Sequence, residues 1–242
     1  MNIKTIMTAA TLLCAVVGCK ENDIALYNEA PRLEYVTVAS CTFNDVDYLN
    51  AYIADVKTTE KECKVTAQLI GRLLTEPMTF CMKGEQAENS DFEVTARFSN
   101  PYTFPTSVPT CEASVMVTCP TKEFASPYQG TSKTGVLEVT SDTSNPAHQF
   151  GLGREENLIC SLNVTLQVHP DNWDSEFWYP YSSAKYIFMM ETFKTTLDNI
   201  EKTQANQRTL RAAYSAYLDE HENEPLLDDE GNPLTIEDFP LN

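Results

Sequence analysis

The side chains that could carry acid–base or nucleophilic chemistry are few and scattered in this sequence. Its three histidines are His148, His169 and His221. None of them belongs to a nucleophile motif such as GxSxG, in which a serine and a histidine base act together. Carboxylates are abundant, but in so acidic a chain their presence does not single out a glycosidase-type pair. We therefore expect no enzyme, and we keep a hydrolase only as a weak alternative.

The densest group of binding-type side chains is aromatic, lies between residues 173 and 181, and includes both tryptophans. Flat rings can stack on sugars or grip a peptide or partner protein, because their large apolar area is desolvated at little entropic cost. The alternative, which we favour, is that the rings only fill the seam between two parts of the fold. The candidate ligand or partner contacts are Trp173, Phe177, Trp178, Tyr179 and Tyr181.

Metal ligands do not form a convincing pattern. The chain has no Cys-x-x-Cys pair, and its histidines lie far from any pair of cysteines, which argues against zinc. Residues 226–237 match part of a calcium-binding EF-hand loop, but Leu226 stands where the first ligand should be. Pro240 also prevents an exiting helix. We expect a solvated acidic turn there, with no metal and no cofactor.

The N-terminus has the form of an export signal. Lys4 is the single charged residue before an apolar stretch at 6–17, which is shorter than the roughly 20 residues that span a bilayer. Residues 16–19 read VVGC and resemble the lipobox of bacterial lipoproteins. The resemblance implies a signal peptide at 1–18 that is removed and a diacylglycerol on Cys19. Each buried methylene contributes about 0.8 kcal/mol, so several acyl chains make a durable anchor.

The residues after this cysteine add a destination. Residues 20–23 read KEND and resemble the acidic export signal behind the acylated cysteine of Bacteroidetes surface lipoproteins. We expect an outer-membrane protein, lipid-anchored and exposed on the cell surface, with a linker at 19–31. No later segment is apolar enough to cross a membrane, so the lipid is the expected membrane contact.

The charge of the chain excludes one class of partner. Its 35 acidic residues outnumber 17 lysines and arginines, for a formal net charge of −18 at pH 7. Such a surface repels phosphates, so we expect no nucleic-acid partner.

The cysteines leave their redox state open. Without Cys14 in the leader and the acylated Cys19, six remain: Cys41, Cys63, Cys81, Cys111, Cys119 and Cys160. An even number in an exported protein permits disulfides. Four of them fall on the apolar phase of predicted strands, as small buried hydrophobes do: Cys63, Cys111, Cys119 and Cys160. Cys111 and Cys119 lie about 27 Å apart along one predicted strand, which is too far for a disulfide.

Period-two alternation indicates a β-rich body. The alternating or β-rich stretches are 33–38, 48–56, 63–69, 78–83, 92–98, 111–119, 136–140 and 158–168. Alternation gives each strand one buried and one wet face, which is typical of antiparallel sheets. We predict a mainly β fold, with an immunoglobulin-like antiparallel β-sandwich over 32–169.

The period then changes to that of a helix. One apolar stripe, at spacings of four and three residues, comprises Tyr186, Met190, Phe193, Leu197 and Ile200. Ser182 or Ser183 could cap this helix. A second helix is predicted over 203–221, with Leu210, Tyr214 and Tyr217 inward. An aromatic junction and C-terminal helical hairpin would thus occupy 170–222, followed by a solvated acidic tail at 223–242.

Together these parts resemble a known family. The lipobox is followed by RLEY at 32–35, PDNW at 170–173, YSSAKY at 181–186 and DEGNP at 229–233. This order is similar to that of the Bacteroidetes lipoproteins called the domain of unknown function 4843 family. The resemblance implies an accessory lipoprotein of a nutrient uptake system, with a SusC-like TonB-dependent transporter and a SusD-like lipoprotein as partners and a glycan or oligopeptide as ligand.

The sequence therefore favours a non-enzymatic, lipid-anchored cell-surface protein, an accessory subunit of a SusC/SusD-like uptake complex. A free-standing glycan- or peptide-binding module is the main alternative, and an envelope hydrolase is the weak one.

Overall fold

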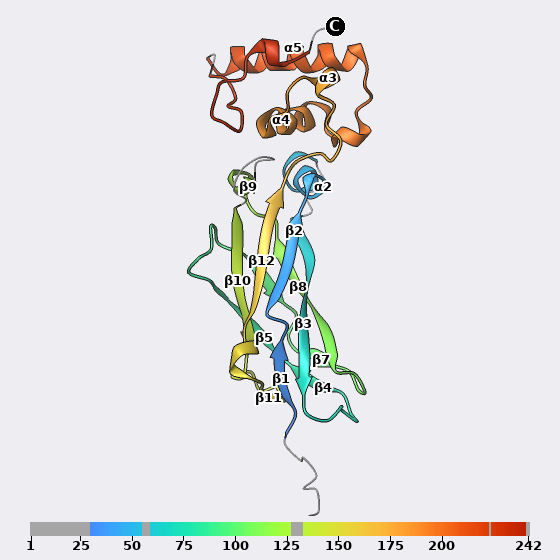
Figure 1. Ribbon diagram of the computed structural model, residues 1–242, viewed down its shortest axis with the longest axis vertical. Helices are drawn as coiled ribbons and strands as arrows, with labels where there is room; N and C mark the ends of the chain where they lie inside the picture. The colour runs from blue at the N-terminus through green and yellow to red at the C-terminus, as the bar shows by residue number, and fades with distance from the viewer. Residues whose placement is uncertain (1–29, 55–58, 127–132, 223, 241–242) are drawn as a thin grey trace, which may run out of the picture. The chain divides into compact units, whose positions relative to one another are not determined.

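The computed structural model describes residues 30–54, 59–126, 133–222 and 224–240 (Figure 1). The expected signal peptide at 1–18, Cys19 and the KEND segment lie outside the described residues. We call residues 32–168 the β region and residues 170–240 the helical region. The chain is mainly β, and none of the described helices has the length and apolar character needed to cross a membrane.

The strands are numbered in chain order. They are β1 (Arg32–Tyr35), β2 (Val38–Phe43), β3 (Glu60–Ile70), β4 (Met78–Phe80), β5 (Met82–Gln86), β6 (Ala96–Phe98), β7 (Tyr102–Phe104), β8 (Thr110–Thr118), β9 (Ala125–Ser126), β10 (Thr134–Ser141), β11 (Gly151–Leu152) and β12 (Cys160–Gln167). Within the described residues they form one sheet in the order β11-β1-β3-β8-β6 and a second in the order β2-β12-β10-β5, with β9 beside β12. A small sheet pairs β4 with β7.

The sheets are not purely antiparallel, which corrects the sequence prediction. The central pair β3–β8 is antiparallel, from Glu60 opposite Thr118 to Gln68 opposite Thr110. However, β1 is parallel to β11, and β12 is parallel to both β2 and β9. The reason is that the chain changes sheets after β1, so β2 lies beside the last strand rather than beside its neighbour in sequence (Figure 1).

The alternation predicted from sequence places side chains from both sheets in one core. The inward residues of β3 are buried, as are those of β8 and β12: Cys63, Val65, Ala67, Leu69, Ala113, Val115, Val117, Cys160, Leu162, Val164 and Leu166. They belong to one hydrophobic cluster. This arrangement is β-sandwich-like, because each sheet buries the face that its period-two pattern makes apolar.

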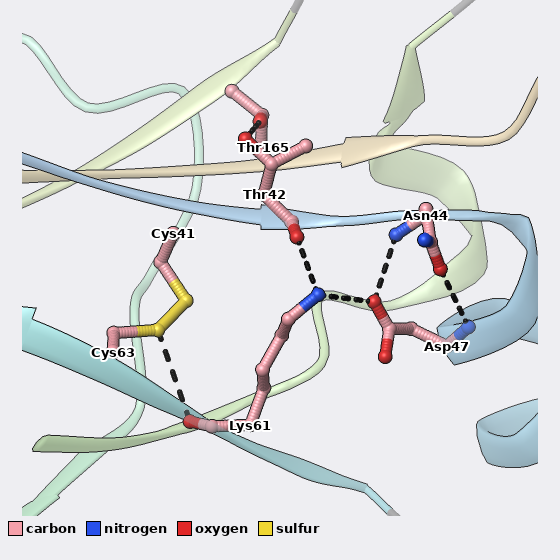
Figure 2. Close-up of a disulfide and its surroundings, with 7 residues drawn as sticks. All are labelled: Cys41, Thr42, Asn44, Asp47, Lys61, Cys63 and Thr165. Atoms are coloured by element: carbon pink, nitrogen blue, oxygen red, sulfur yellow. Dashed lines mark hydrogen bonds and ion pairs between the residues drawn. A yellow bond between two sulfur atoms is a disulfide. The ribbon is translucent and has the colours of Figure 1, made fainter.

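A disulfide joins the two sheets. It links Cys41 on β2 to Cys63 on β3, with 5.6 Å between the Cα atoms (Figure 2). The expectation that Cys63 is only a small buried hydrophobe is therefore wrong, because a cysteine on the opposite sheet lies within bonding reach. Cys111 and Cys119 are unpaired, as predicted. Burial raises the pKa of the Cys119 thiol to about 11, which keeps it protonated and unreactive.

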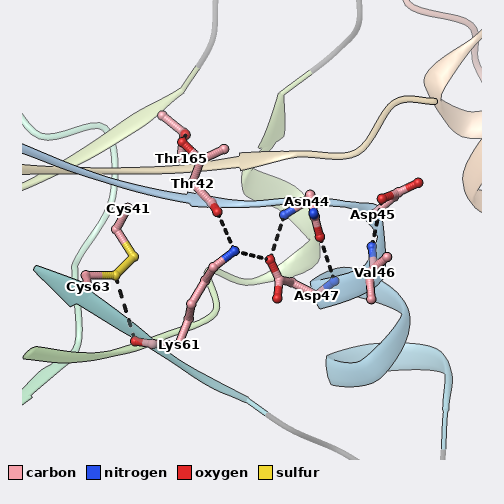
Figure 3. Close-up of polar contacts among 9 residues, drawn as sticks. All are labelled: Cys41, Thr42, Asn44, Asp45, Val46, Asp47, Lys61, Cys63 and Thr165. Atoms are coloured by element: carbon pink, nitrogen blue, oxygen red, sulfur yellow. Dashed lines mark hydrogen bonds and ion pairs between the residues drawn. A yellow bond between two sulfur atoms is a disulfide. The ribbon is translucent and has the colours of Figure 1, made fainter. Parts of the chain in front are cut away.

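The predicted strand at 48–56 is wrong. The structure has α2 (Asp45–Tyr48) and a single π-helical turn, η2 (Leu49–Ile53). The Asn44 side chain accepts the Asp47 backbone N–H at 3.1 Å, and the Asp47 carboxylate accepts the Asn44 N–H at 2.9 Å (Figure 3). This reciprocal capping box starts a helix where the side-chain pattern alone suggested a strand.

A lysine ties this helix start to two strands. Lys61 on β3 donates from Nζ to the Thr42 carbonyl of β2 at 2.8 Å and to the Asp47 carboxylate at 2.7 Å (Figures 2 and 3). The capping carboxylate is therefore also the partner of a cation. This polar bridge lies beside the disulfide, and both contacts join β2 to β3 (Figure 2).

Other predicted strands are shorter than expected or divided. The stretch 78–83 is split between β4 and β5, which belong to different sheets, and the stretch 92–98 is strand only over β6. Period two persists through such breaks, because alternation records burial and not the continuity of hydrogen bonding.

The helical region holds α3 (Ser175–Trp178), α4 (Ser183–Phe193) and α5 (Gln204–Glu220), and the 3₁₀ turns of the chain are η3 (Lys122–Phe124), η4 (Glu155–Asn157), η5 (Leu197–Asn199) and η6 (Ile236–Asp238). The predicted cap of the first helix is confirmed at Ser182, whose hydroxyl accepts the Lys185 N–H. The second helix is capped by Thr203, whose hydroxyl accepts the Asn206 N–H. The single stripe from Tyr186 to Ile200 is not one helix. At Lys194 the backbone turns left-handed, with φ at 56°, and α4 stops.

The C-terminal segment is not a fully solvated tail, contrary to expectation. Leu234 and Phe239 are buried, and Phe239 stacks on Tyr214 of α5 with 4.0 Å between ring centroids. The Tyr214 hydroxyl donates to the Leu234 carbonyl at 2.8 Å. The many acidic residues masked this packing in the sequence, because a few apolar side chains are enough to dock a charged segment.

Candidate functional site

The structure separates the five predicted aromatic residues into packed and accessible ones. Trp178 is fully buried, and Phe177 packs edge-on against it with 4.7 Å between ring centroids. Tyr179 is half-buried, with its φ at 64°. Burial removes Trp178 from the candidate contacts, in agreement with the packing alternative for this residue.

Trp173 and Tyr181 are the two rings that meet at a cavity. They are half-buried and lie edge to face, with 5.2 Å between ring centroids. The Trp173 indole N–H donates to the Tyr179 carbonyl at 2.8 Å, and the Tyr181 hydroxyl donates to the Val168 carbonyl at 3.4 Å. These bonds fix both rings by their polar ends and leave ring surface for the cavity wall.

The cavity has a volume of about 660 Å³ and an acidic rim. Its lining residues are Pro170, Asp171, Trp173, Ser175, Pro180, Tyr181, Asp228, Asp229 and Glu230. One wall thus comes from the aromatic junction and the other from the turn at 228–230. The lining contains no lysine, arginine or histidine, and its four carboxylates are hydrogen-bond acceptors only.

The acidic turn is held in shape by its own carboxylates. Asp228 accepts the backbone N–H groups of Glu230 and Asn232 at 2.9 and 2.7 Å. These bonds, led by the one from Asn232, hold the pKa of Asp228 below its ordinary value. Asp229 accepts the Ser183 N–H at 3.0 Å in the first turn of α4, where a negative charge is also favoured by the helix dipole.

A buried lysine connects the two walls. Lys185 is fully buried, and its Nζ donates to the carbonyls of Trp178 at 2.5 Å, Pro180 at 3.1 Å and Asp238 at 2.6 Å. The same nitrogen lies 5.6 Å from the Trp173 ring centroid. The first two carbonyls belong to the aromatic junction and the third to the C-terminal segment that carries the acidic turn. Burial lowers the pKa of Lys185 to about 7.

A second polar contact fixes the start of the aromatic junction. The Asp174 side chain caps α3 by accepting the N–H groups of Glu176 and Phe177, both at 3.1 Å, and it pairs with Lys202 at 2.9 Å. The Lys202 pair and these backbone bonds keep the pKa of Asp174 below its ordinary value. The junction is therefore anchored directly after Trp173 by Asp174, and the Trp173 ring itself is anchored by its bond to the Tyr179 carbonyl.

Sequence reasoning identified Trp173 and Tyr181 but missed the rest of this site. Lys185 gave little signal, because one lysine beside an apolar stripe usually lies on the solvent face. In the sequence, the turn at 228–230 resembles only part of a calcium loop, and Asp171 belongs to the PDNW stretch without any pattern that marks a site. Within the described residues, no group of three metal-ligating side chains is close enough to hold an ion.

Comparisons with known proteins give weak likenesses. No family model matches the chain, and no curated protein matches its sequence. Among solved structures, CBD12 from CALX1.2 is 11% identical with a TM-score of 0.33, over 56% of this chain and 44% of that one. The apo-form Calx CBD1 domain is 12% identical with a TM-score of 0.31, over 57% of this chain and 98% of that one. Murine CRIg is 9% identical with a TM-score of 0.17, over 59% of this chain and 100% of that one.

The chain thus spans less than half the length of the first of these structures. Similarity at this level carries no argument about function. The mainly β character of the protein is read from its own strands and their pairing.

Proposed function

We propose that this protein is a non-enzymatic, lipid-anchored cell-surface protein that serves as an accessory subunit of a SusC/SusD-like nutrient uptake complex. Its anchor would be the acylated Cys19, at the end of the VVGC box. Its role would be to hold a ligand near a SusC-like transporter and a SusD-like lipoprotein in the outer membrane.

The fold that goes with this proposal is an immunoglobulin-like β-sandwich followed by a helical hairpin. The sandwich would be formed by the two large sheets and the hairpin by α4 and α5. The three parallel pairings make it a variant of the antiparallel form that the sequence alone suggested.

The observation that carries the proposal is the cavity that Trp173 and Tyr181 share with the acidic turn. Cavities of about 300–1,000 Å³ with a few aromatic side chains are typical small-ligand sites. This one falls within that range, and its walls are held by buried polar contacts, so it exists before any ligand arrives. A preformed cavity loses little conformational entropy when it captures a ligand.

A free-standing glycan- or peptide-binding module is the second candidate. One observation favours it: the cavity's two sides are held by hydrogen bonds within the helical region, from Lys185 and Asp229. Such a module would bind ligand equally well without a transporter.

Affinity purification from native membranes tests the proposal. A C-terminally tagged full chain should co-isolate a TonB-dependent channel in near-stoichiometric amount, and mass spectrometry of its N-terminus should find an acylated Cys19. Cys19→Ala should abolish both results. Cys14→Ala is the matched control, because this cysteine is removed with the leader and its loss should change neither.

The outcomes separate the alternatives. An acylated protein that brings no channel would support the free-standing module. A retained leader, or an unmodified thiol at Cys19, would overturn the lipoprotein proposal itself.

A further inference from the structure

We propose that the cavity bounded by Trp173, Tyr181 and the turn at 228–230 binds an uncharged carbohydrate. This inference rests on the proposed function, since it names the ligand class of the same site. It does not depend on which transporter the protein accompanies. The argument uses the rings, the hydrogen-bonding character of the lining and the rigidity of the walls.

The rings provide apolar surface on one wall. Trp173 and Tyr181 are half-buried, and Pro170 and Pro180 extend this wall with flat, rigid apolar surface. A pyranose has one face of C–H bonds, which packs against an aromatic ring much as other apolar groups do. Both rings already have a partner for their polar ends, so a ligand needs to meet only their ring surface.

The polar side chains of the lining accept hydrogen bonds. The carboxylates of Asp228, Asp229 and Glu230 on the acidic turn are acceptors only, as is that of Asp171 on the aromatic junction, and the Ser175 hydroxyl of the junction can also accept. Asp228 and Asp229 already accept backbone N–H groups, yet each carboxylate has about four lone-pair positions. Asp171 and Glu230 are exposed. A ligand that satisfies these acceptors must therefore be rich in donors.

This requirement favours a polyol over the other ligands considered. Each sugar hydroxyl can donate to a carboxylate, and adjacent hydroxyls can bind its two oxygens together. A peptide backbone brings one acceptor for every donor, and its carbonyls would face carboxylates without a partner. Anionic sugars such as uronic or sulfated ones would be repelled by the four carboxylates. A basic side chain would also satisfy the acceptors and pack over the ring faces, so a cationic peptide is the competing ligand that the test must separate from a sugar.

Binding would require little rearrangement. Lys185 fixes the aromatic junction to the C-terminal segment, and Asp229 fixes the acidic turn to the start of α4. The two walls are thus positioned by contacts outside the cavity. A site held in this way loses little conformational entropy when a ligand binds.

Isothermal titration calorimetry on the full mature chain in detergent tests this inference. The probes are neutral hexasaccharides of gluco, manno, galacto and xylo configuration, with tetralysine and a polygalacturonate hexamer as charged comparisons. We expect binding to at least one neutral hexasaccharide and none to the anionic one. Trp173→Ala should weaken that binding about tenfold through lost ring contact.

Because Trp173→Ala also removes the bond to Tyr179, two surface variants keep the test independent of folding. Asp171→Ala and Glu230→Ala should each weaken binding about threefold to tenfold through a lost acceptor. Glu88→Ala is the matched control: it removes the same charge from an exposed position in the β region and should leave affinity unchanged.

Tryptophan fluorescence gives a second readout. Trp173 lines the cavity and Trp178 is buried, so ligand should change the emission of the first only. Trp173→Phe should abolish the fluorescence change while calorimetric affinity stays within about threefold, because the ring surface is conserved.

Three results would overturn the inference. The first is that tetralysine binds and no neutral hexasaccharide does. The second is that no neutral hexasaccharide binds at millimolar concentration. The third is that none of the variants Asp171→Ala, Glu230→Ala and Trp173→Ala changes the affinity for a hexasaccharide. None of these depends on co-isolation of a channel. The proposed ligand class can therefore be wrong while the accessory role is right, and the accessory role can be wrong while the ligand class is right.

Discussion

The β region and the helical region are held together by different means. In the β region, the inward side chains of both sheets form an apolar core, and a covalent bond between Cys41 and Cys63 joins the sheets. In the helical region, polar groups are central: Lys185 is fully buried, and Gln207 donates from inside α5 to the Phe177 carbonyl at 2.8 Å. Apolar packing is spread over many residues, whereas a buried polar contact concentrates stability in one.

This difference indicates which substitutions should disturb the cavity without unfolding the β region. The cavity lies in the helical region, whose walls depend on a few hydrogen bonds. The loss of one should loosen the site and leave the β region folded. Both tryptophans are in the helical region, so their fluorescence reports on it, while hydrogen exchange of the amides in β3 and β8 reports on the β region.

The largest expected effect comes from removing the bond between the sheets. Cys41→Ala combined with Cys63→Ala should lower the free energy of unfolding of the β region by about 3 kcal/mol, because the cross-link closes a 22-residue separation in the unfolded chain. Urea unfolding followed by circular dichroism measures this change. Cys111→Ala is the control and should shift the midpoint little, since that thiol is free and half-buried. Equal midpoints for the double variant and the wild type would contradict the disulfide's role.

The second effect should be confined to the helical region. Lys185→Met keeps the length of the side chain but leaves the carbonyls of Trp178, Pro180 and Asp238 without a donor. We expect the free energy of unfolding measured by tryptophan fluorescence to fall by about 2 kcal/mol, with hydrogen exchange in β3 and β8 unchanged. Hydrogen exchange should speed up at 178–181 and 236–240. Lys194→Met, at an exposed position, is the control; a comparable loss in that variant would argue against the role of Lys185.

A third variant tests whether the β region contains a polar contact of the same kind. Glu34 on β1 is fully buried and accepts from Arg154, with Nε to Oε2 at 2.9 Å. Glu34→Gln should lower stability by about 1.5 kcal/mol at pH 7. The Arg154 hydrogen bond holds the pKa of Glu34 below its ordinary value.

The stabilisation by Glu34 is therefore present above the ordinary glutamate pKa and is lost as the pH falls through the lowered one. Urea midpoints of the wild type and Glu34→Gln should converge in acid. Glu60→Gln, in the exposed pair with Arg97, is the comparison and should behave like the wild type at every pH.

The smallest expected effect is a pH dependence of the helical region. Burial lowers the pKa of Lys185 to about 7 from an ordinary value of 10.5, with the facing Asp238 acting in the opposite direction. Between these values the unfolded chain binds the additional proton, so stability should rise with pH, by about 1 kcal/mol between pH 7 and 8. The fluorescence transition measured at both values detects this rise. The rise should be absent in Lys185→Met; its persistence there would assign it to another group.

Much of the fold could be predicted from the sequence, namely those parts in which buried and exposed positions recur at a regular spacing along the chain. The strands β3, β8 and β12 followed from alternation, and the cap of α4 followed from a serine hydroxyl placed before an apolar stripe. The predictions that are wrong depend on single residues or pairs of residues. Residues 45–53 are helical, starting from one reciprocal pair, Asn44 and Asp47, and α4 ends early at one left-handed residue, Lys194.

The candidate site was predictable only in part. The aromatic cluster marked the junction, but which ring packs and which lines the cavity depends on the approach of α5 and of the C-terminal segment. Trp178 and Trp173 are five positions apart and have the same chemistry, yet one is fully buried and the other lines the cavity. Sequence spacing contains no information about the neighbours that decide this.

The sequence by itself determined the properties that are local or additive: the acidic charge, the alternation that gives β3, β8 and β12 an inner face, and the serine cap of α4. Only the tertiary structure decided the properties that depend on distant residues meeting. These are the pairing of Cys41 with Cys63, the parallel placement of β2 beside β12, and the burial of Lys185 among three carbonyls. The physical reason is that hydrogen bonds and disulfides are short-ranged and directional, so partners far apart in the chain are specified by the packing of everything between them.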